Sequence, residues 1–305
     1  MTFGAGSRVG RGRWHHDGVS QSRPTPPSRA SAHTLITVAP TGAESTKVDV
    51  PQLPTTLEEL VDTARRCEAA GASLIHLHIR DADHRPTLDQ SRLRASVEAL
   101  REQTDLVVQL STGGSVHDPL GQRLTVLDAE PDSCSLTCGT TNFGDDVFLN
   151  PWPFMVQLYR QSVEREVVPE FELFDLGHVA ALRRLLDQEG LPYGGRVHVD
   201  FVTGVPGGMP GTAAALLAGV ALLPAEVTSW SATGIGRAHL PIAATALAAG
   251  GHLRVGMEDN LVYARGRAVE HNDELVSRAA ELATLMERPP MTTADARALL
   301  GVKRR

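Results

Sequence analysis

The chain has 305 residues, of which 42% are hydrophobic and 21% charged, a composition typical of a soluble globular enzyme. Its formal net charge of −7 and its aromatic content of 4% argue against a nucleic-acid partner, because phosphates require a basic face and bases stack on aromatic rings. No apolar run reaches the roughly 18 residues of a membrane span, and three cysteines are too few for a disulfide framework, so we expect a cytoplasmic protein without a membrane partner.

The first 32 residues differ in composition from the rest. They are rich in Arg, Ser, Gly and Pro and contain a single acidic residue, Asp17. They lack the apolar core of a secretory signal and the amphipathic period of a transit peptide. We therefore expect a disordered tail over residues 1–32, with an Arg-rich transit peptide as the alternative, and a single domain over residues 33–305.

From His33 onward, short β-rich apolar runs alternate with stretches of roughly 10–15 residues that have helical periodicity. The expected strands are residues 34–39, 74–80, 106–110, 133–138, 168–174, 196–202, 226–231 and 252–257. The expected helices are residues 56–70, 88–103, 119–128, 153–165, 177–189, 212–222, 237–249 and 272–287. Eight strand–helix repeats in a chain of this length predict an α/β fold, the (β/α)8 TIM barrel. An open doubly wound sheet is disfavoured because no G-x-G-x-x-G turn follows the first strand.

The polar and glycine clusters of the chain fall almost entirely at the carboxyl ends of these strands. In a TIM barrel, catalytic groups gather at these ends. The clusters are residues 40–44, 76–81, 111–114, 139–142, 170–175, 203–204, 233–234 and 258–260. Their concentration at one face of the barrel indicates an active site.

His76 and His78 are two residues apart in the second strand, so their side chains share a face. Such a pair can bind a metal ion, and the alternative is that both imidazoles pair with carboxylates inside the barrel. In a closed barrel the eighth strand lies beside the first, so Glu258 can reach the pair as a third ligand. Two imidazoles and one carboxylate with open positions suit catalytic zinc, although iron and manganese also tolerate them. An acidic cap on the last loop is the alternative for Glu258.

Arg254 would place a charge inside the barrel and therefore needs a carboxylate partner. The candidates are Asp259, Glu172 and Glu170. An Asp that an Arg orients beside a divalent metal is a candidate general base, and an inert ion-pair network is the alternative.

The loop Ser111-Thr112-Gly113-Gly114 offers hydroxyls and backbone N–H groups just before an expected helix. Such a loop suits a carboxylate or a phosphate, and an ordinary turn is the alternative. Thr140 and Asn142 can add neutral donors to the same anion.

Five segments at strand ends together resemble the β-keto acid cleavage enzyme family, formerly a domain of unknown function, whose founding activity is 3-keto-5-aminohexanoate cleavage. The segments are residues 36–43, 76–81, 111–114, 169–172 and 250–260, and the resemblance extends from about residue 33 to residue 302. It implies a TIM barrel that binds one zinc ion per subunit through His76, His78 and Glu258.

The same resemblance implies a reaction in which a β-keto acid and acetyl-CoA give acetoacetate and a new acyl-CoA, so both partners are small molecules. In the family scheme the residue that matches Asp259, paired with the match of Arg254, deprotonates the keto acid. The carbanion attacks the thioester, CoA is transferred, and a retro-Claisen step releases acetoacetate. Zinc polarises the keto oxygen. Glu172 matches a further catalytic residue.

The resemblance also implies substrate contacts. Residues Ser111, Gly114, Thr140 and Asn142 match the region that holds the substrate carboxylate. Glu44 matches a position where a carboxylate meets a substrate ammonium, and an exposed loop residue is the alternative. Family members form homo-oligomers, and we expect a tetramer here. Another metal-dependent barrel lyase, aldolase or hydrolase, and a non-catalytic metal- or acyl-CoA-binding barrel, are the competing functions.

Overall fold

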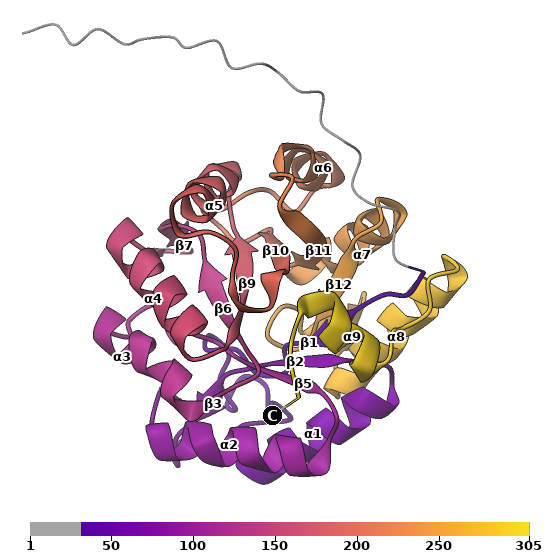
Figure 1. Ribbon diagram of the computed structural model, residues 1–305. Coiled ribbons are helices and arrows are strands. Elements are labelled where there is room, and N and C mark those ends of the chain that lie inside the picture. Colours follow the sequence, from indigo (N-terminus) through magenta and orange to yellow (C-terminus); the bar gives the residue numbers. More distant parts are fainter. Residues whose placement is uncertain (1–31, 305) are drawn as a thin grey trace, which may run out of the picture.

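The computed structural model describes residues 32–304. It contains a closed barrel of parallel strands surrounded by helices (Figure 1). In sequence order the barrel strands are β1 Ile36–Val38, β2 Leu74–Leu77, β5 Val107–Leu110, β6 Ser133–Thr137, β9 Val168–Leu173, β10 Val197–Thr203, β11 Val227–Gly234 and β12 His252–Val255. Around the barrel they follow the order β1-β12-β11-β10-β9-β6-β5-β2, which closes. The TIM-barrel prediction is thus confirmed, whereas the tail expected over residues 1–32 lies, except for residue 32, outside the described residues.

Helices connect successive strands and form the outer ring. They are α1 Leu57–Ala69, α2 Gln90–Gln103, α3 Leu120–Thr125, α4 Trp152–Glu164, α5 Leu176–Glu189, α6 Ala213–Leu222, α7 His239–Ala248 and α8 Asn272–Leu285. α1 shows how the local sequence forms such a helix. Thr56 and Glu59 form a capping box at its start, and its buried residues Leu60, Ala64 and Cys67 are spaced at the helical period. Within residues 32–304, no helix is both long and apolar enough to cross a membrane.

Several elements differ from the sequence-based expectation. The second strand, expected over residues 74–80, ends at Leu77, and β3 (Ile79–Arg80) pairs outside the barrel with β4 (Pro86–Thr87). Two further hairpins were not predicted: β7 (Thr141–Phe143) with β8 (Asp146–Phe148), and β13 (Val262–Ala264) with β14 (Arg267–Ala268). These strands are only two or three residues long, too short to give an alternating pattern in the sequence.

The last helix, α9 (Thr293–Leu300), was also absent from the prediction. Its Ala296 and Leu300 pack in one apolar cluster with Leu35, Leu74 and Val107, which lie at the amino-terminal ends of barrel strands. α9 therefore closes the bottom of the barrel and leaves the carboxyl-terminal face for the site.

Gly256 controls the backbone where β12 leaves the barrel. Its φ is 152°, and a Cβ on it would lie 1.9 Å from the carbonyl oxygen of Ala39, the residue just after β1. We expect Gly256→Ala to lower the free energy of unfolding by about 3 kcal/mol or more, because the two strands would have to separate. Urea denaturation followed by circular dichroism measures this loss.

A matched control is Gly266→Ala, since Gly266 also has a positive φ, of 79°, but open space around its Cα. The loss expected there is only about 1 kcal/mol, the cost of the left-handed conformation. Equal losses in the two variants would contradict a steric role for Gly256.

Candidate metal centre and reaction site

A cavity of about 230 Å³ opens at the carboxyl ends of the barrel strands. Side chains from loops and strand ends far apart in the sequence line it, because parallel strands all end at this face. Its polar and charged lining includes Glu44, His76, His78, Ser111, Glu172, Arg254, Glu258 and Asp259. The cavity is therefore where the structure brings together most of the site residues expected from the sequence.

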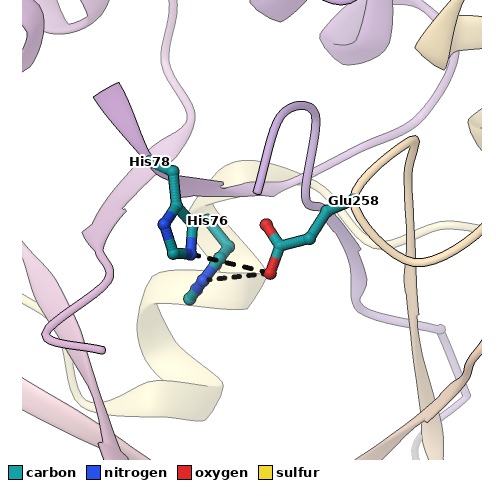
Figure 2. A group of neighbouring side chains, drawn as sticks. All are labelled: His76, His78 and Glu258. Carbon is teal, nitrogen blue, oxygen red and sulfur yellow. Dashed lines mark ion pairs between the residues drawn. The ribbon is translucent and has the colours of Figure 1, made fainter. Parts of the chain in front are cut away.

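His76, His78 and Glu258 form one group in this cavity (Figure 2). The Glu258 Oε1 atom lies 3.8 Å from His76 Nε2 and 3.6 Å from His78 Nε2. β1 pairs with β2 on one side and with β12 on the other, so Glu258, just beyond β12, faces the histidine pair across β1. Ligand atoms of the three residues all lie within 4.8 Å of one another, which is the spacing of a metal-binding group.

Both imidazoles are in the form that binds a metal. Burial, together with the nearby Arg254 guanidinium, lowers the pKa of His76 to about 3, and burial also lowers the pKa of His78, so both rings are neutral. His76 Nδ1 lies 2.6 Å from Gln109 Oε1. Because this oxygen only accepts, Nδ1 carries the proton and the Nε2 lone pair is left toward Glu258.

Gln109 was not predicted as a site residue, although it contacts His76. Its amide nitrogen donates in turn to Ser133 Oγ at 3.2 Å, which holds the amide in the orientation that His76 needs. The available signal was one polar residue inside the apolar strand Val107–Leu110.

Glu258 fits the third ligand position. Although burial opposes its ionisation, the Arg254 guanidinium lowers the pKa of Glu258 to about 2, so the carboxylate is charged. Its Oε1 accepts from Arg254 Nη2 at 2.5 Å, whereas its buried Oε2 has no hydrogen-bond partner among the described residues. A buried anionic oxygen without a partner is costly, and a divalent cation would satisfy it. Gly42 gives this side chain room, since a Cβ there would lie 2.6 Å from Glu258 Cγ.

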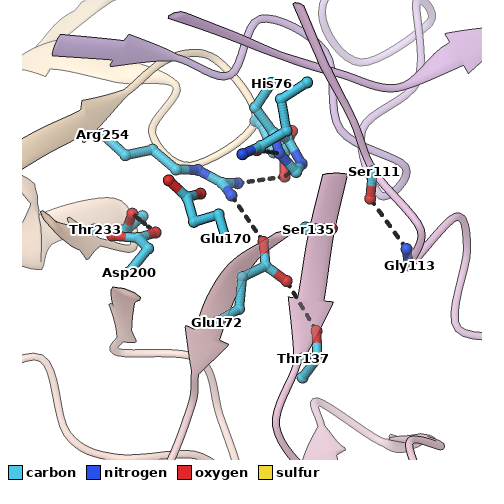
Figure 3. Close-up of polar contacts among 12 residues, drawn as sticks. His76, Ser111, Gly113, Ser135, Thr137, Glu170, Glu172, Asp200, Thr233 and Arg254 are labelled. Atoms are coloured by element: carbon cyan, nitrogen blue, oxygen red, sulfur yellow. Dashed lines mark hydrogen bonds and ion pairs between the residues drawn. The ribbon is translucent and has the colours of Figure 1, made fainter. Parts of the chain in front are cut away.

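Arg254 lies at the centre of a buried ionic network beside the metal group (Figure 3). Its guanidinium contacts both carboxylate oxygens of Asp259, at 3.1 and 3.0 Å, and Glu172 Oε1 at 3.2 Å. Glu172 Oε2 accepts from Thr137 Oγ1 at 2.8 Å. Glu170, the other partner considered for Arg254, instead lies 3.4 Å from His198 Nε2.

The Arg254 guanidinium thus forms ion pairs with three carboxylates, those of Asp259, Glu172 and Glu258. Because its positive charge is shared, burial prevails at Asp259 and raises the pKa of that carboxyl, although Arg254 opposes the shift. A carboxylate that is fixed in orientation and basic for its type is suited to accept a proton.

The loop of residues 111–114, predicted to bind an anion, lines the cavity only in part. Ser111 and Gly114 line it, and Ser111 Oγ accepts from the Gly113 N–H at 3.2 Å (Figure 3). Thr112 is buried and turned away, with its hydroxyl donating to Ser135 O at 2.7 Å. Thr140 accepts from the Asn150 N–H at 2.8 Å, and Asn142 is exposed on β7. None of these last three is among the described lining residues, so their part in substrate binding stays a prediction.

Glu44 lies at the rim of the cavity, exposed to solvent, in a loop that Arg80 holds. Arg80 is buried, and its Nη2 donates to Gly42 O at 2.7 Å and to Ser45 O at 2.9 Å. The sequence showed Arg80 only as one member of a polar strand end, and its positioning role appears in the structure alone.

The wall across the barrel from the metal group is apolar. Phe143, Phe148 and Phe174 lie edge to face, with ring centroids 6.1–6.3 Å apart, and all three line the cavity. They follow β6 and β9, which lie opposite β1 in the barrel order. This wall was not predicted from the sequence, because two of its rings belong to the β7–β8 hairpin, whose strands are too short for a periodic pattern.

Comparisons with known proteins agree on one family. A family model described as beta-keto acid cleavage enzyme matches residues 33–302. The 3-keto-5-aminohexanoate cleavage enzyme of Acetoanaerobium sticklandii is 37% identical over 272 residues, covering 88% of this chain and 98% of the relative. The 3-oxoadipate:acetyl-CoA acetyltransferase of Cupriavidus necator is 35% identical, with 88% and 94% covered.

The fold recurs in a solved structure, the binary complex of ObcA with oxaloacetate. The TM-score is 0.71 at 22% identity, covering 83% of this chain and 68% of that chain. At this identity the likeness establishes the shared barrel and nothing about the ligand.

Proposed function

The chain belongs to the beta-keto acid cleavage enzyme family, as the sequence resemblance predicted, and we propose that it is a zinc-dependent enzyme that converts a β-keto acid and acetyl-CoA into acetoacetate and a new acyl-CoA. One observation carries the proposal: His76, His78 and Glu258 form a group that could hold a metal ion, in the same cavity as Arg254 and Asp259. Names of relatives support the co-substrate, since that of the Cupriavidus necator enzyme includes acetyl-CoA.

His76, His78 and Glu258 would hold one zinc ion per subunit. Two neutral imidazoles and one carboxylate are a typical ligand set of catalytic zinc, which keeps at least one coordination position open for water or substrate. When bound there, the ion supplies Lewis acidity that polarises the keto oxygen of the substrate.

Asp259 removes the proton from the carbon between the keto and carboxylate groups. Arg254 holds both oxygens of Asp259, and Glu172, itself bonded to Thr137, fixes the other side of the guanidinium. The catalytic carboxylate therefore has one orientation before substrate arrives, which lowers the reorganisation that the reaction requires.

The remaining steps balance without an external reagent. The carbanion attacks the acetyl carbonyl of acetyl-CoA and expels the CoA thiolate. The thiolate adds to the original keto carbon, and the bond between that carbon and the deprotonated carbon breaks. The products are the new acyl-CoA and an acetoacetate carbanion, which takes the proton back from Asp259. We assign the substrate carboxylate to Ser111 and Gly114, which line the cavity beside this centre.

The decisive experiment combines a metal assay with product detection. Purified protein is analysed by inductively coupled plasma mass spectrometry and then incubated with acetyl-CoA and a panel of β-keto acids, with acetoacetate as the readout. We expect one zinc ion per chain and acetoacetate from at least one keto acid. Zinc without acetoacetate from any keto acid would favour another metal-dependent lyase or hydrolase, or a non-catalytic barrel. If the purified protein contains no metal, the proposed metal site is refuted, whatever the product assay shows.

Glu44→Gln is expected to change substrate preference and to leave zinc content unchanged. A carboxylate at the rim favours a keto acid that carries an ammonium group, and removing its charge should lower kcat/KM for such a substrate about tenfold. A keto acid without nitrogen is the control and should be affected less than about twofold. An unchanged substrate profile would remove Glu44 from the site.

The cytoplasmic location and the homotetramer that the resemblance implies stay predictions. Size-exclusion chromatography with light scattering measures the assembly, and a monomer at working concentration would contradict it.

A further inference from the structure

A second cavity, of about 590 Å³, adjoins the reaction site. Ile235, Glu258 and Asp259 line both cavities, so the second one reaches the proposed zinc ligand and the proposed base from the side. It lies between the loop that leads from β11 into α7 and the segment after β12, including the β13–β14 hairpin. α7 and α8, which contribute to it, are neighbours in the outer ring (Figure 1).

This second cavity carries a concentration of positive charge in a chain whose net charge is −7. Arg237, Arg265 and Arg278 line it, each from a different element: the β11–α7 loop, the β13–β14 turn and α8. Elsewhere in residues 32–304 many arginines pair with carboxylates, but none of these three forms a described ion pair. Three guanidiniums that form no described ion pair, around one cavity, favour an anionic ligand.

Arg278 is held in place yet keeps donors free. Its guanidinium lies over the Tyr263 ring, 4.3 Å from the centroid, and its Nη1 donates to Tyr263 O. Its Nε and Nη2 are buried and have no hydrogen-bond partner among the described residues. Buried donors without partners are unfavourable, so a bound anion would recover their hydrogen bonds.

The lining also includes apolar residues at the surface. Leu240 and Val262 are large hydrophobic residues that are 44% and 56% exposed, and both face this cavity. The cavity thus offers cations, an exposed apolar stretch and a wall that it shares with the reaction site at Asp259. A ligand that fits all three has phosphates at one end, an extended arm and a reactive group at the other.

Acetyl-CoA has this construction, with a 3′-phosphate and a diphosphate at one end and the thioester at the other. We propose that the second cavity is the CoA-binding site, in which Arg237, Arg265 and Arg278 bind the phosphates and the arm passes Ile235 to bring the thioester to Asp259. The location agrees with a general property of TIM barrels, in which loops after the seventh and eighth strands, here β11 and β12, commonly bind phosphate. The proposal rests on the proposed function for the identity of the thioester.

Three single substitutions test it kinetically: Arg237→Gln, Arg265→Gln and Arg278→Gln. Each is expected to raise KM for acetyl-CoA about fivefold to thirtyfold and to leave KM for the keto acid within about twofold. Arg278→Lys keeps the charge but loses the planar fork, so it should recover part of the loss. Arg94→Gln is the matched control, because Arg94 is an exposed arginine on α2, away from both cavities.

Direct binding separates this proposal from the proposed function. Adenosine 3′,5′-bisphosphate contains phosphates of CoA but no thioester, and its binding to the full chain can be measured by calorimetry without any turnover. We expect saturable binding that weakens as salt is raised and falls about fivefold or more in each Arg→Gln variant. Arg237 and Arg265 are exposed, so their variants should fold normally and report on binding alone.

The outcomes are distinguishable. Arginine-dependent binding of the bisphosphate in a protein that cleaves no keto acid would keep this site and refute the proposed reaction. Cleavage with an unchanged KM for acetyl-CoA in all three variants would refute this site and keep the reaction. A change in oligomeric state without a change in bisphosphate binding would show that the arginines face a second copy of the chain, and would also overturn the proposal.

Discussion

His76→Ala is expected to remove bound zinc and to abolish acetoacetate formation in the same variant. His76 is 1% exposed, and its Nε2 faces Glu258 while Gln109 holds its Nδ1. Without this imidazole, only His78 and Glu258 remain of the proposed ligands, which are too few for the three-ligand site of a catalytic zinc. We expect zinc content to fall from about one per chain to near zero and kcat/KM to fall at least about 10³-fold.

The control is His252→Ala, which removes another buried imidazole of the same barrel. His252 lies in β12 and its Nδ1 accepts from the Leu35 N–H at 3.1 Å, outside the metal group. This variant should lose stability but retain zinc. A His76→Ala protein that still holds one zinc per chain would show that the metal site is assigned to the wrong residues.

Asp259→Asn is expected to keep zinc and to lose turnover. The amide has nearly the shape of the carboxylate but cannot accept the substrate proton, so kcat should fall about 10²- to 10⁴-fold, the usual contribution of a general base. Arg254 keeps its contacts with Glu172 and Glu258 in this variant, so the metal group should stay in place. Zinc content and KM for the keto acid should therefore change little.

Proton transfer can be followed by itself in this variant. Enzyme-catalysed exchange of the keto acid's α-hydrogens with D2O, measured by NMR in the absence of acetyl-CoA, should stop in Asp259→Asn. Asp83→Asn is the control, since Asp83 is an exposed carboxylate in the β3–β4 turn. If the Asp259 variant exchanges and turns over at the normal rate, another group is the base.

Asp259 and Glu172 hold the Arg254 guanidinium in different ways. Asp259 contacts the guanidinium with both oxygens, whereas Glu172 contacts it with one and is tied to Thr137 by the other. Glu172, which the resemblance implies is catalytic, is therefore expected to act by positioning Arg254. Its loss should alter kcat through the orientation of Asp259 and leave zinc content unchanged.

The sequence by itself determined the barrel and the grouping of His76, His78 and Glu258. Most barrel strands are short segments rich in β-favouring residues, and several of the following helices, α1 among them, have a 3.6-residue period, so both signals are local and survive without tertiary information. The order of strands around a closed barrel then brings Glu258 beside the His76–His78 pair. These predictions needed only periodicity and the closure of a parallel barrel.

Tertiary structure alone decided the parts that depend on short or distant contacts. The β7–β8 hairpin is too short for a periodic signal, yet it carries Phe143 and Phe148 into the cavity. The position of Thr112, turned away from the cavity toward Ser135, depends on a contact with the neighbouring strand β6. Likewise, the sharing of Arg254 among three carboxylates and the three arginines of the second cavity arise where strands, helices and loops from separate parts of the chain meet. Such arrangements are set by packing between segments far apart in the chain, and no local pattern of residues encodes them.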